Sequence, residues 1–295
     1  MTRPDPARPD LTGRRVLLVG CGDIGTGLGE TLLARGAAVW GLRRDPAGLP
    51  AGFHGVAGDF TRPDGLAAVA GQAFDHVVLT FTPAGYTDAA YAAAYVDGMR
   101  HVLAALDPAP GHVILVSSTS VYHQDDCGWV DERSATEPTH FAGRRTLEAE
   151  AVLRDSGLPH VIARFAGIYG PGRTRLIDQV RAGHACGPEE RLYVNRIHRA
   201  DGVGFLAHLI DLREQGADLD DLYLVTDSYP VTMWDVQSWI ASKLGLDPFA
   251  LKTGPVPGRT SKRCRNARMR ATGYELRYPD YMAGYGELLG TDASA

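Results

Sequence analysis

The sequence predicts an α/β protein with a doubly wound parallel sheet, followed by a smaller C-terminal lobe. Three observations support this prediction. Short apolar runs alternate with segments of helical periodicity as far as Arg164. The apolar runs are continuous, as strands buried on both faces require, and do not alternate with polar residues. After Gly172 the regular rhythm ends, and short strand-like pieces separate the remaining helices.

The sheet is expected to contain six strands in the first part of the chain. They are predicted at residues 15–19, 38–42, 53–57, 76–80, 112–117 and 160–164. Helices are predicted between them over residues 25–35, in a segment led by Pro63, and over 88–106 and 141–156. Glycines or an Asp-Pro step follow three of these helices, which sets where they end.

Beyond residue 172 the sequence predicts a different organisation. Helices are expected at about 176–182, 199–213 and 233–244, with strand-like pieces at 192–197 and 222–225. We therefore expect an exposed tail over residues 1–12 and a sheet domain over 13–172. Residues 173–295 are expected to build mainly the smaller lobe and to interleave with the sheet.

Composition limits the classes of function. The chain has 295 residues, of which 44% are hydrophobic, so it can bury a sizeable core. A net charge of -5 argues against nucleic-acid binding by bulk electrostatics. The four cysteines lie far apart without C-x-x-C spacing, which predicts no metal site and a reducing, cytoplasmic setting. No apolar run reaches the roughly 18 residues of a membrane span. A small molecule is the expected partner.

A glycine-rich motif joins the first predicted strand to the first predicted helix. It reads Gly20-Cys21-Gly22-Asp23-Ile24-Gly25, with the spacing G-x-G-x-x-G. Gly20 permits a tight turn, Gly22 lets a pyrophosphate approach the backbone, and Gly25 allows close packing of helix and strand. The helix N-terminus supplies N–H groups and partial positive charge. This context predicts a Rossmann-type fold that binds a nicotinamide dinucleotide through these six residues; the alternative is a glycine turn without a ligand.

The end of the second strand bears on the choice between NAD and NADP. An NAD site usually has an acidic residue there, which binds the ribose 2′-hydroxyl. Here Arg43 and Arg44 occupy the place, and guanidinium groups suit a 2′-phosphate. We therefore expect NADP in preference to NAD. Solvated arginines, with Asp45 restoring a preference for NAD, are the alternative.

Two further strand ends are expected to border the cofactor. Asp59 and Phe60 follow the third strand, where a carboxylate can accept a hydrogen bond from the adenine amino group. A turn or helix-capping role for Asp59 is the equal alternative. Thr80, Phe81 and Thr82 end the fourth strand and complete the predicted cofactor contacts.

Several segments together resemble the extended short-chain dehydrogenase/reductases, the NAD-dependent epimerase/dehydratase-like family. They are the glycine motif, Gly58-Asp59-Phe60, Ser117-Ser118-Thr119-Ser120-Val121-Tyr122, the run from Arg164 to Arg173, and Arg196-Ile197-His198-Arg199-Ala200-Asp201. The resemblance implies a cofactor across the carboxyl edge of the sheet and a substrate under the smaller lobe. It also implies catalysis by a Ser or Thr, a Tyr and a Lys, with the first role falling on Ser118 or its neighbour Thr119.

The chain departs from the family at its Tyr-x-x-x-Lys pair. Phe141 stands where the family has the tyrosine, and Arg145 where it has the lysine. Arg145 can still bind the nicotinamide ribose, but phenylalanine has no exchangeable proton. The sequence therefore predicts an atypical active site with another proton carrier.

Other proton carriers follow the predicted strands. Tyr122 and Glu132 are the further catalytic candidates, and Tyr169 is a candidate for substrate contact. Each also has a structural reading, because tyrosines at such positions often only pack and loop carboxylates are often solvated.

Three further residues are candidates for substrate binding. Arg173 and Arg191 can join the basic run from Lys262 to Arg265 as a phosphate clamp, although a solvated face explains the same charges. His198 can line the substrate pocket or serve as a structural histidine.

The sequence thus supports two functions. One is an oxidoreductase or epimerase/dehydratase that acts on a small carbonyl, hydroxyl or sugar-nucleotide-like substrate. The other is a catalytically silent NAD(P)-binding redox sensor or regulatory protein. The resemblance also implies a homodimer that pairs through the helices near residues 88–106 and 141–156.

Overall fold

The computed structural model describes residues 8–254, 256 and 260–290, which form two compact units. The first unit takes the described residues of 1–121, 138–164 and 203–223. The second takes those of 122–137, 165–202 and 224–295. Neither unit is one continuous piece of the chain.

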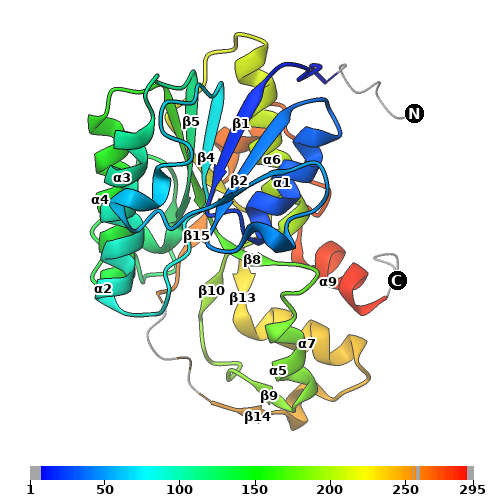
Figure 1. Cartoon of the computed structure of the whole chain (residues 1–295). Coiled ribbons are helices and arrows are strands. Elements are labelled where there is room, and N and C mark those ends of the chain that lie inside the picture. The colour runs from blue at the N-terminus through cyan, green and yellow to red at the C-terminus, as the bar shows by residue number, and fades with distance from the viewer. Residues whose placement is uncertain (1–7, 255, 257–259, 291–295) are drawn as a thin grey trace. The chain divides into compact units, whose positions relative to one another are not determined.

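A seven-stranded parallel sheet forms the centre of the first unit (Figure 1). Its strand order is β12-β7-β5-β4-β1-β2-β3. The bounds are β1 Arg15–Val19, β2 Ala38–Arg43, β3 His54–Ala57, β4 His76–Leu79, β5 His112–Ser118, β7 His160–Phe165 and β12 Leu222–Val225. The expected doubly wound α/β fold is confirmed.

Helices cover both faces of this sheet, as its continuous apolar strands require. In Figure 1, α1 and α6 lie on one side of the strands, and α2, α3 and α4 lie on the other. Their bounds are α1 Asp23–Leu33, α2 Asp88–Tyr91, α3 Gly98–Ala105, α4 Phe141–Asp155 and α6 Arg199–Glu214. Strand residues such as Leu17, Val77 and Val113 are fully buried and pack in one apolar core.

Helices α2 and α3 are parts of one continuous helical segment. A π-helical stretch, η3 Ala92–Asp97, joins them, so the single helix predicted at 88–106 is confirmed with a wider middle turn. Short 3₁₀ turns complete the unit at η1 Pro46–Gly48, η2 Pro63–Leu66 and η4 Thr119–Val121.

The helix predicted to begin at Pro63 is a single 3₁₀ turn. The backbone crosses itself closely there. A Cβ at Gly65 would stand only 2.0 Å from the carbonyl oxygen of Asp59. The predicted Pro63-led helix is thus present as a 3₁₀ turn over Pro63–Leu66 and not as an α-helix.

The strand-like piece predicted at residues 222–225 is β12, in the region that was expected to interleave with the sheet. It is the edge strand of the central sheet, beside β7. Its residues are buried, and Ile162 donates its N–H to the carbonyl of Asp221 at 2.8 Å. Helix α6 and β12 therefore extend the alternation of helix and strand that builds the sheet.

The second unit consists of short strands and helices. The strands pair as β10-β13, β11-β8, β14-β9 and β15-β6. They run over β6 Trp129–Val130, β8 Gly167–Tyr169, β9 His184–Ala185, β10 Tyr193–Val194, β11 Arg196–His198, β13 Val231–Thr232, β14 Lys252–Thr253 and β15 Arg263–Cys264. The helices are α5 Arg175–Arg181, α7 Met233–Lys243, the 3₁₀ turn η5 Pro248–Ala250, α8 Ala267–Ala271 and α9 Tyr281–Leu289. Val180, Val236 and Tyr285 belong to its buried core.

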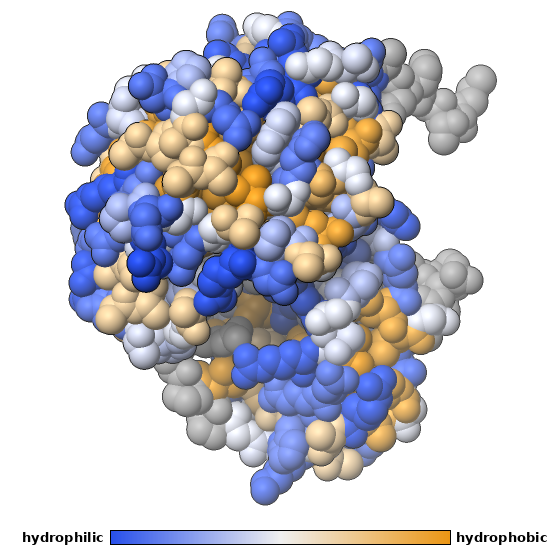
Figure 2. Space-filling model, in the orientation of Figure 1, coloured by the Kyte–Doolittle hydropathy of each residue, from blue (hydrophilic) through white to orange (hydrophobic). Residues whose placement is uncertain are grey.

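Polar side chains cover most of the face drawn in Figure 2, with apolar residues in patches between them. Among the described residues, the exposed large hydrophobic side chains are those of Tyr86, Trp129, Tyr229, Leu246 and Phe249. In the described part of the chain, no helix has both the length and the apolar character that crossing a membrane demands.

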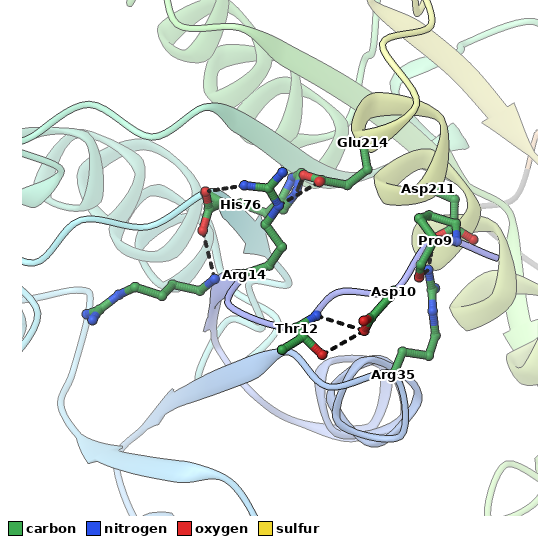
Figure 3. A network of polar contacts seen from close by, with 10 residues as sticks. Pro9, Asp10, Thr12, Arg14, Arg35, His76, Asp211 and Glu214 are labelled. Atoms are coloured by element: carbon green, nitrogen blue, oxygen red, sulfur yellow. Dashed lines mark hydrogen bonds and ion pairs between the residues drawn. The ribbon is translucent and has the colours of Figure 1, made fainter.

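A polar network surrounds the amino ends of the central strands (Figure 3). The carboxylate of Glu214 accepts a hydrogen bond from Arg14 Nε at 2.6 Å and contacts His76 Nε2 at 2.8 Å. Nearby, Arg35 is ion-paired with Asp211, and it also donates to the carbonyl of Pro9 at 3.0 Å. These contacts join the N-terminal segment and α1 to the end of α6.

Two histidines are buried at this edge, side by side. His76 begins β4 and His112 begins β5; they are register partners with ring centroids 5.9 Å apart. Burial lowers the pKa of His76, and burial together with the neighbouring His76 lowers the pKa of His112 to about 3. Both rings are therefore neutral in the folded protein near neutral pH.

We expect His112 to make the protein acid-sensitive. The unfolded chain binds a proton at His112 below about pH 6.5, whereas the folded chain does so only near pH 3. The stability contributed by the neutral ring is thus complete above pH 6.5 and is lost as the pH falls. Near pH 5, His112→Phe should recover about 2 kcal/mol relative to the original chain, measured by urea unfolding at several pH values.

His54→Phe is the matched control, because His54 also begins a strand of this sheet but is exposed. It should leave the pH dependence unchanged. Parallel stability curves for His112→Phe and the unaltered protein would contradict the expectation.

Candidate functional site

The glycine motif forms a sharp turn between β1 and α1. Gly20 has a φ of +79°, and a Cβ there would stand 2.7 Å from the carbonyl oxygen of Thr80. Thr80 Oγ1 in turn donates to the carbonyl of Gly20 at 2.9 Å, and it lies 3.2 Å from where a Cβ of Gly25 would be. Thr80, predicted as a cofactor contact, is thus placed to support the turn from β4.

The start of α1 is open where a phosphate would bind. Gly22 is the N-cap of the helix and makes no side-chain capping bond; Asp23 and Ile24 follow it in the first turn. A Cβ at Gly22 would have only the carbonyl oxygen of Gly20 nearby, at 3.7 Å. Cys21 is buried beneath the turn. An uncapped helix start behind an open glycine is the usual arrangement for binding a phosphate through backbone N–H groups.

Arg43 lies beside this turn. It ends β2, is half-buried, and its Nη1 donates to the carbonyl of Cys21 at 3.5 Å. Arg44 is exposed. The carboxylate of Asp45 accepts a hydrogen bond from the N–H of Ala47 at 3.0 Å and so caps the turn η1. Of these three side chains, Arg43 is the one in contact with the glycine motif.

The side chain of Asp59 stabilises the turn that follows it. Its Oδ1 accepts hydrogen bonds from the N–H and the hydroxyl of Thr61, at 3.0 and 2.6 Å, and these bonds lower the pKa of the carboxyl. Phe60 stacks on Phe81, with centroids 4.7 Å apart. Thr82 is exposed at the start of the next loop.

Ser118 ends β5, half-buried, and its Oγ accepts a hydrogen bond from the N–H of Ser120 at 3.1 Å. Thr119 begins the turn η4. Helix α4 starts directly against this turn, since a Cβ at Gly143 would stand 2.5 Å from the carbonyl oxygen of Ser120. The strand order places β5 next to β4 and β4 next to β1, so Ser118 and the glycine turn share the carboxyl edge of the sheet.

A buried charge network lies behind Ser118, and sequence reasoning missed it. Ser117 donates its hydroxyl to Glu150 Oε1 at 2.5 Å, and Arg164 donates to both oxygens of Glu150 at 2.9 and 2.6 Å. All three side chains are buried. The network ties β5, α4 and β7 together immediately next to the candidate catalytic serine. An acidic residue in the middle of an otherwise apolar helix face was its only sequence signal.

Phe141 and Arg145, one turn apart in α4, have different surroundings. Phe141 lies in an aromatic cluster with Tyr86, Tyr91 and His140, whose ring centroids are 5.1, 5.3 and 4.2 Å from its own. Arg145 donates to both oxygens of Asp88, at 2.7 and 3.1 Å, and also pairs with Glu148. The guanidinium of Arg145 is therefore occupied by carboxylates. Sequence analysis did not single out Tyr86 or His140.

Tyr122 and Glu132, in the second unit, make bonds that hold backbone. The Tyr122 ring is buried, and its hydroxyl donates to the carbonyl of Asp131 at 2.8 Å. Glu132 Oε1 accepts a hydrogen bond from the N–H of Leu224 at 2.9 Å. Each of these two catalytic candidates thus uses its polar side-chain group to hold a backbone group.

Tyr169 and His198 are also buried in the second unit. The Tyr169 hydroxyl donates to the carbonyl of Asp280 at 3.4 Å, and burial raises its pKa. His198 packs against Tyr278 with centroids 3.8 Å apart, its Nδ1 accepts from the N–H of Ala200, and burial lowers its pKa. These contacts are those expected of a structural histidine.

The basic run near the C-terminus is not a uniformly solvated face. Lys262 is buried, which lowers the pKa of its ammonium group, and its Nζ donates to Thr260 at 2.8 Å. The guanidinium of Arg263 lies 4.9 Å from the ring of Trp129. Arg173 and Arg191 are exposed.

The four cysteines, all in the described part of the chain, are free thiols. Over residues 8–254, 256 and 260–290, no group of three or more His, Cys, Asp or Glu side chains is arranged to hold a metal ion.

A family model for NAD(P)H-binding proteins matches residues 20–210, which is more than half of the chain. The chain belongs to this NAD(P)H-binding family. The match begins at Gly20, the first residue of the glycine turn, and extends into α6. No curated protein matches the sequence.

The chain is also similar to solved structures. A Methylobacillus flagellatus protein, provisionally described as an NAD-dependent epimerase/dehydratase, is 40% identical with a TM-score of 0.79, over 94% of this chain and 98% of that one. DesIV, a dTDP-glucose 4,6-dehydratase from Streptomyces venezuelae solved with NAD, is 20% identical, covering 94% and 96%, with a TM-score of 0.77. MoeE5, solved with UDP-glucuronic acid and NAD, is 21% identical, covering 95% and 98%, with a TM-score of 0.76. The predicted resemblance to epimerase/dehydratase-type proteins is confirmed.

We expect Glu150→Gln to lower the free energy of unfolding of this protein strongly. The substitution leaves the buried guanidinium of Arg164 without its carboxylate, and breaking a buried ion pair in this way costs about 3–5 kcal/mol. Chemical denaturation monitored by circular dichroism measures the loss.

Glu148→Gln is the matched control on the same helix. Glu148 is 44% exposed and pairs with Arg145, so its loss should cost less than about 1 kcal/mol. Equal effects of the two substitutions would show that the buried network contributes nothing special.

Proposed function

We propose that this protein is an NAD(P)-dependent oxidoreductase or epimerase/dehydratase that acts on a hydroxyl or carbonyl carbon of a sugar-nucleotide-like substrate. The observation that carries the proposal is the glycine turn at Gly20, open at the start of α1, with Ser118 at the same edge of the sheet. A dinucleotide site and a hydroxyl that can polarise a carbonyl are the minimum that hydride transfer needs.

The residues of the first unit suggest which group would bind the cofactor and which would act on the substrate. The dinucleotide, when bound, exchanges a hydride with the substrate carbon. The backbone at Gly22 and the first turn of α1 would hold its pyrophosphate. The hydroxyl of Ser118, or of Thr119, would donate a hydrogen bond to the substrate oxygen. The bond from the N–H of Ser120 to Ser118 Oγ leaves the serine proton available for this purpose.

NADP is the preferred cofactor in this proposal. Arg43 contacts the glycine turn, whereas Asp45, the residue that would favour NAD, is occupied in capping η1. Guanidinium groups recognise phosphates by charge-assisted hydrogen bonds. DesIV and MoeE5 were solved with NAD, so the preference for NADP rests on Arg43 alone.

The substrate class rests on similarity in fold. DesIV is named for dTDP-glucose, and MoeE5 was solved with UDP-glucuronic acid. Exposed Arg173 and Arg191 of the second unit would suit the phosphates of such a molecule. Tyr169, Tyr122 and Glu132 would contribute packing and support more than proton transfer, given the bonds they already make.

A second candidate function is a silent NAD(P)-binding sensor. The observation that favours it is the aromatic environment of Phe141, where the family has a tyrosine, together with the carboxylates that occupy Arg145. Turnover distinguishes the two functions.

A homodimer is also part of the proposal. It would pair through the helical segment from α2 to α3 and through α4, which pack against each other on one side of the sheet. Analytical ultracentrifugation tests it.

Replacing Arg43 should change the cofactor preference. Arg43→Asp removes the contact for a 2′-phosphate and offers a carboxylate to a 2′-hydroxyl. We expect the ratio of NADPH to NADH affinity to fall at least about tenfold, measured by quenching of intrinsic fluorescence. Arg100→Asp makes the same change of charge on an exposed helix position and should leave the ratio unaltered. An unchanged ratio for Arg43→Asp would contradict the NADP assignment.

Replacing Ser118 separates the enzyme from the sensor. If the protein is an enzyme, Ser118→Ala should lower kcat about 10²-fold with little change in cofactor affinity, because the hydroxyl acts on the reacting oxygen. The assay follows nicotinamide absorbance with UDP-glucose, UDP-glucuronic acid and dTDP-glucose. Ser120→Ala, which removes a neighbouring exposed hydroxyl, is the control. Tight binding without turnover in the unaltered protein would favour the sensor.

A further inference from the structure

A tyrosine hydroxyl lies beside Phe141, although Phe141 has none itself. The ring of Tyr86 is 5.1 Å from that of Phe141, and its hydroxyl oxygen is 3.5 Å from His140 Nδ1. Tyr86 and His140 are stacked, with their planes 14° apart. The three side chains come from the loop after β4 and from the first turn of α4.

The direction of the hydrogen bond follows from the helix cap. His140 is the N-cap of α4, and its Nδ1 accepts a hydrogen bond from the N–H of Ala142 at 3.4 Å. With this bond in place the nitrogen carries no proton, and its single lone pair faces two donors, the N–H of Ala142 and the Tyr86 hydroxyl. The Tyr86 hydroxyl is then the donor and His140 the acceptor, which is the polarity that a proton leaving Tyr86 requires.

Accessibility distinguishes Tyr86 from the other tyrosines of the cluster. Tyr86 is 69% exposed, so a substrate oxygen can approach its hydroxyl. Tyr91 and Tyr95 lie deeper: burial raises the pKa of Tyr91, and it raises that of Tyr95 to about 12. Neither is suited to proton transfer near neutral pH.

The loop that carries Tyr86 is fixed on its C-terminal side. Asp88, two residues later, forms the two-pronged ion pair with Arg145 of α4. Thr87 caps α2 by accepting a hydrogen bond from the N–H of Ala90 at 3.2 Å. The ion pair therefore holds the start of α2 against α4, in the place where Tyr86 meets His140. Arg145 has a positioning role in this arrangement.

The same loop begins at the candidate cofactor site. It follows β4, which lies between β1 and β5 in the sheet. The glycine turn follows β1, and Ser118 ends β5. Carboxyl ends of neighbouring parallel strands meet at one edge, so Tyr86 belongs to the loops of that edge.

We propose that Tyr86 is the proton-transferring residue of this protein and that His140 accepts the proton from it. The inference rests on the proposed function. When the substrate alcohol is oxidised, its C–H bond breaks and the hydride reduces the oxidised nicotinamide. The alcohol proton moves to Tyr86 Oη, and the Tyr86 proton moves to the lone pair of His140 Nδ1, which gives up its hydrogen bond from the Ala142 N–H. His140 then releases the proton to solvent, and the bond from Ala142 forms again. A carbonyl forms on the substrate, and one proton is released for each dinucleotide reduced.

The test compares Tyr86→Phe with Tyr91→Phe, which removes a hydroxyl from the same aromatic cluster. Oxidation of UDP-glucose, UDP-glucuronic acid and dTDP-glucose is followed with NADP⁺ and NAD⁺, and dinucleotide affinity is measured separately. We expect Tyr86→Phe to lower kcat about 10²-fold or more with unchanged dinucleotide affinity. Tyr91→Phe should behave as the unaltered protein, and adding Phe141→Tyr to Tyr86→Phe should restore turnover. A kcat for Tyr86→Phe within about threefold of Tyr91→Phe overturns the proposal.

A second measurement needs no substrate. The ¹⁵N resonance of His140 Nδ1 should shift on Tyr86→Phe and stay in place on Tyr91→Phe, because the hydroxyl of Tyr86, and not that of Tyr91, contacts this nitrogen. If the resonance is unchanged on Tyr86→Phe, the hydrogen bond from Tyr86 to His140 is absent and the proposal is overturned, even where the protein is active. Failure of the unaltered protein to bind either dinucleotide, or to oxidise any of the three sugars, instead counts against the proposed function.

Discussion

The close crossing of Gly20 and Thr80 is the constraint on which the candidate site depends. The backbone of the turn after β1 passes so near the end of β4 that no side chain fits at Gly20. Thr80 then adds a hydrogen bond from its own side chain to the turn. One contact thus sets the position of the α1 N-terminus and the start of the loop that leads to Tyr86. The dinucleotide site and the candidate proton donor are consequently built on the same pair of neighbouring strands.

The two ends of the central sheet use buried polar groups differently. At the amino ends, His76 and His112 are kept neutral by burial, and Glu214 satisfies one of the His76 nitrogens. Near the carboxyl ends, Glu150 and Arg164 form a buried ion pair, and Ser117 donates a further hydrogen bond to Glu150. Burying a charge is tolerable only with such a partner. The first arrangement ties stability to pH, whereas the second holds β5, α4 and β7 in one geometry next to Ser118.

Phe141 and Arg145, both in the first turns of α4, contact the same neighbouring segment. Phe141 packs against the ring of Tyr86, and Arg145 forms an ion pair with Asp88. Both contacts bear on one short loop, which carries an exposed tyrosine hydroxyl toward His140. Phe141 and Arg145 are therefore physically linked through that loop.

Local sequence determined much of this protein. The strands of the central sheet, the glycine turn and the position of Arg43 follow from apolar runs, φ requirements and short spacings, all of which act between near neighbours in the chain. Tertiary structure decided the rest. The place of β12 at the sheet edge, the partner of Glu150 and the meeting of Tyr86 with His140 depend on segments dozens of residues apart. The physical reason is that burial and pairing are properties of the folded chain: whether a carboxylate is solvated or paired, and whether a hydroxyl is sealed or accessible, is set by residues that no local pattern can identify.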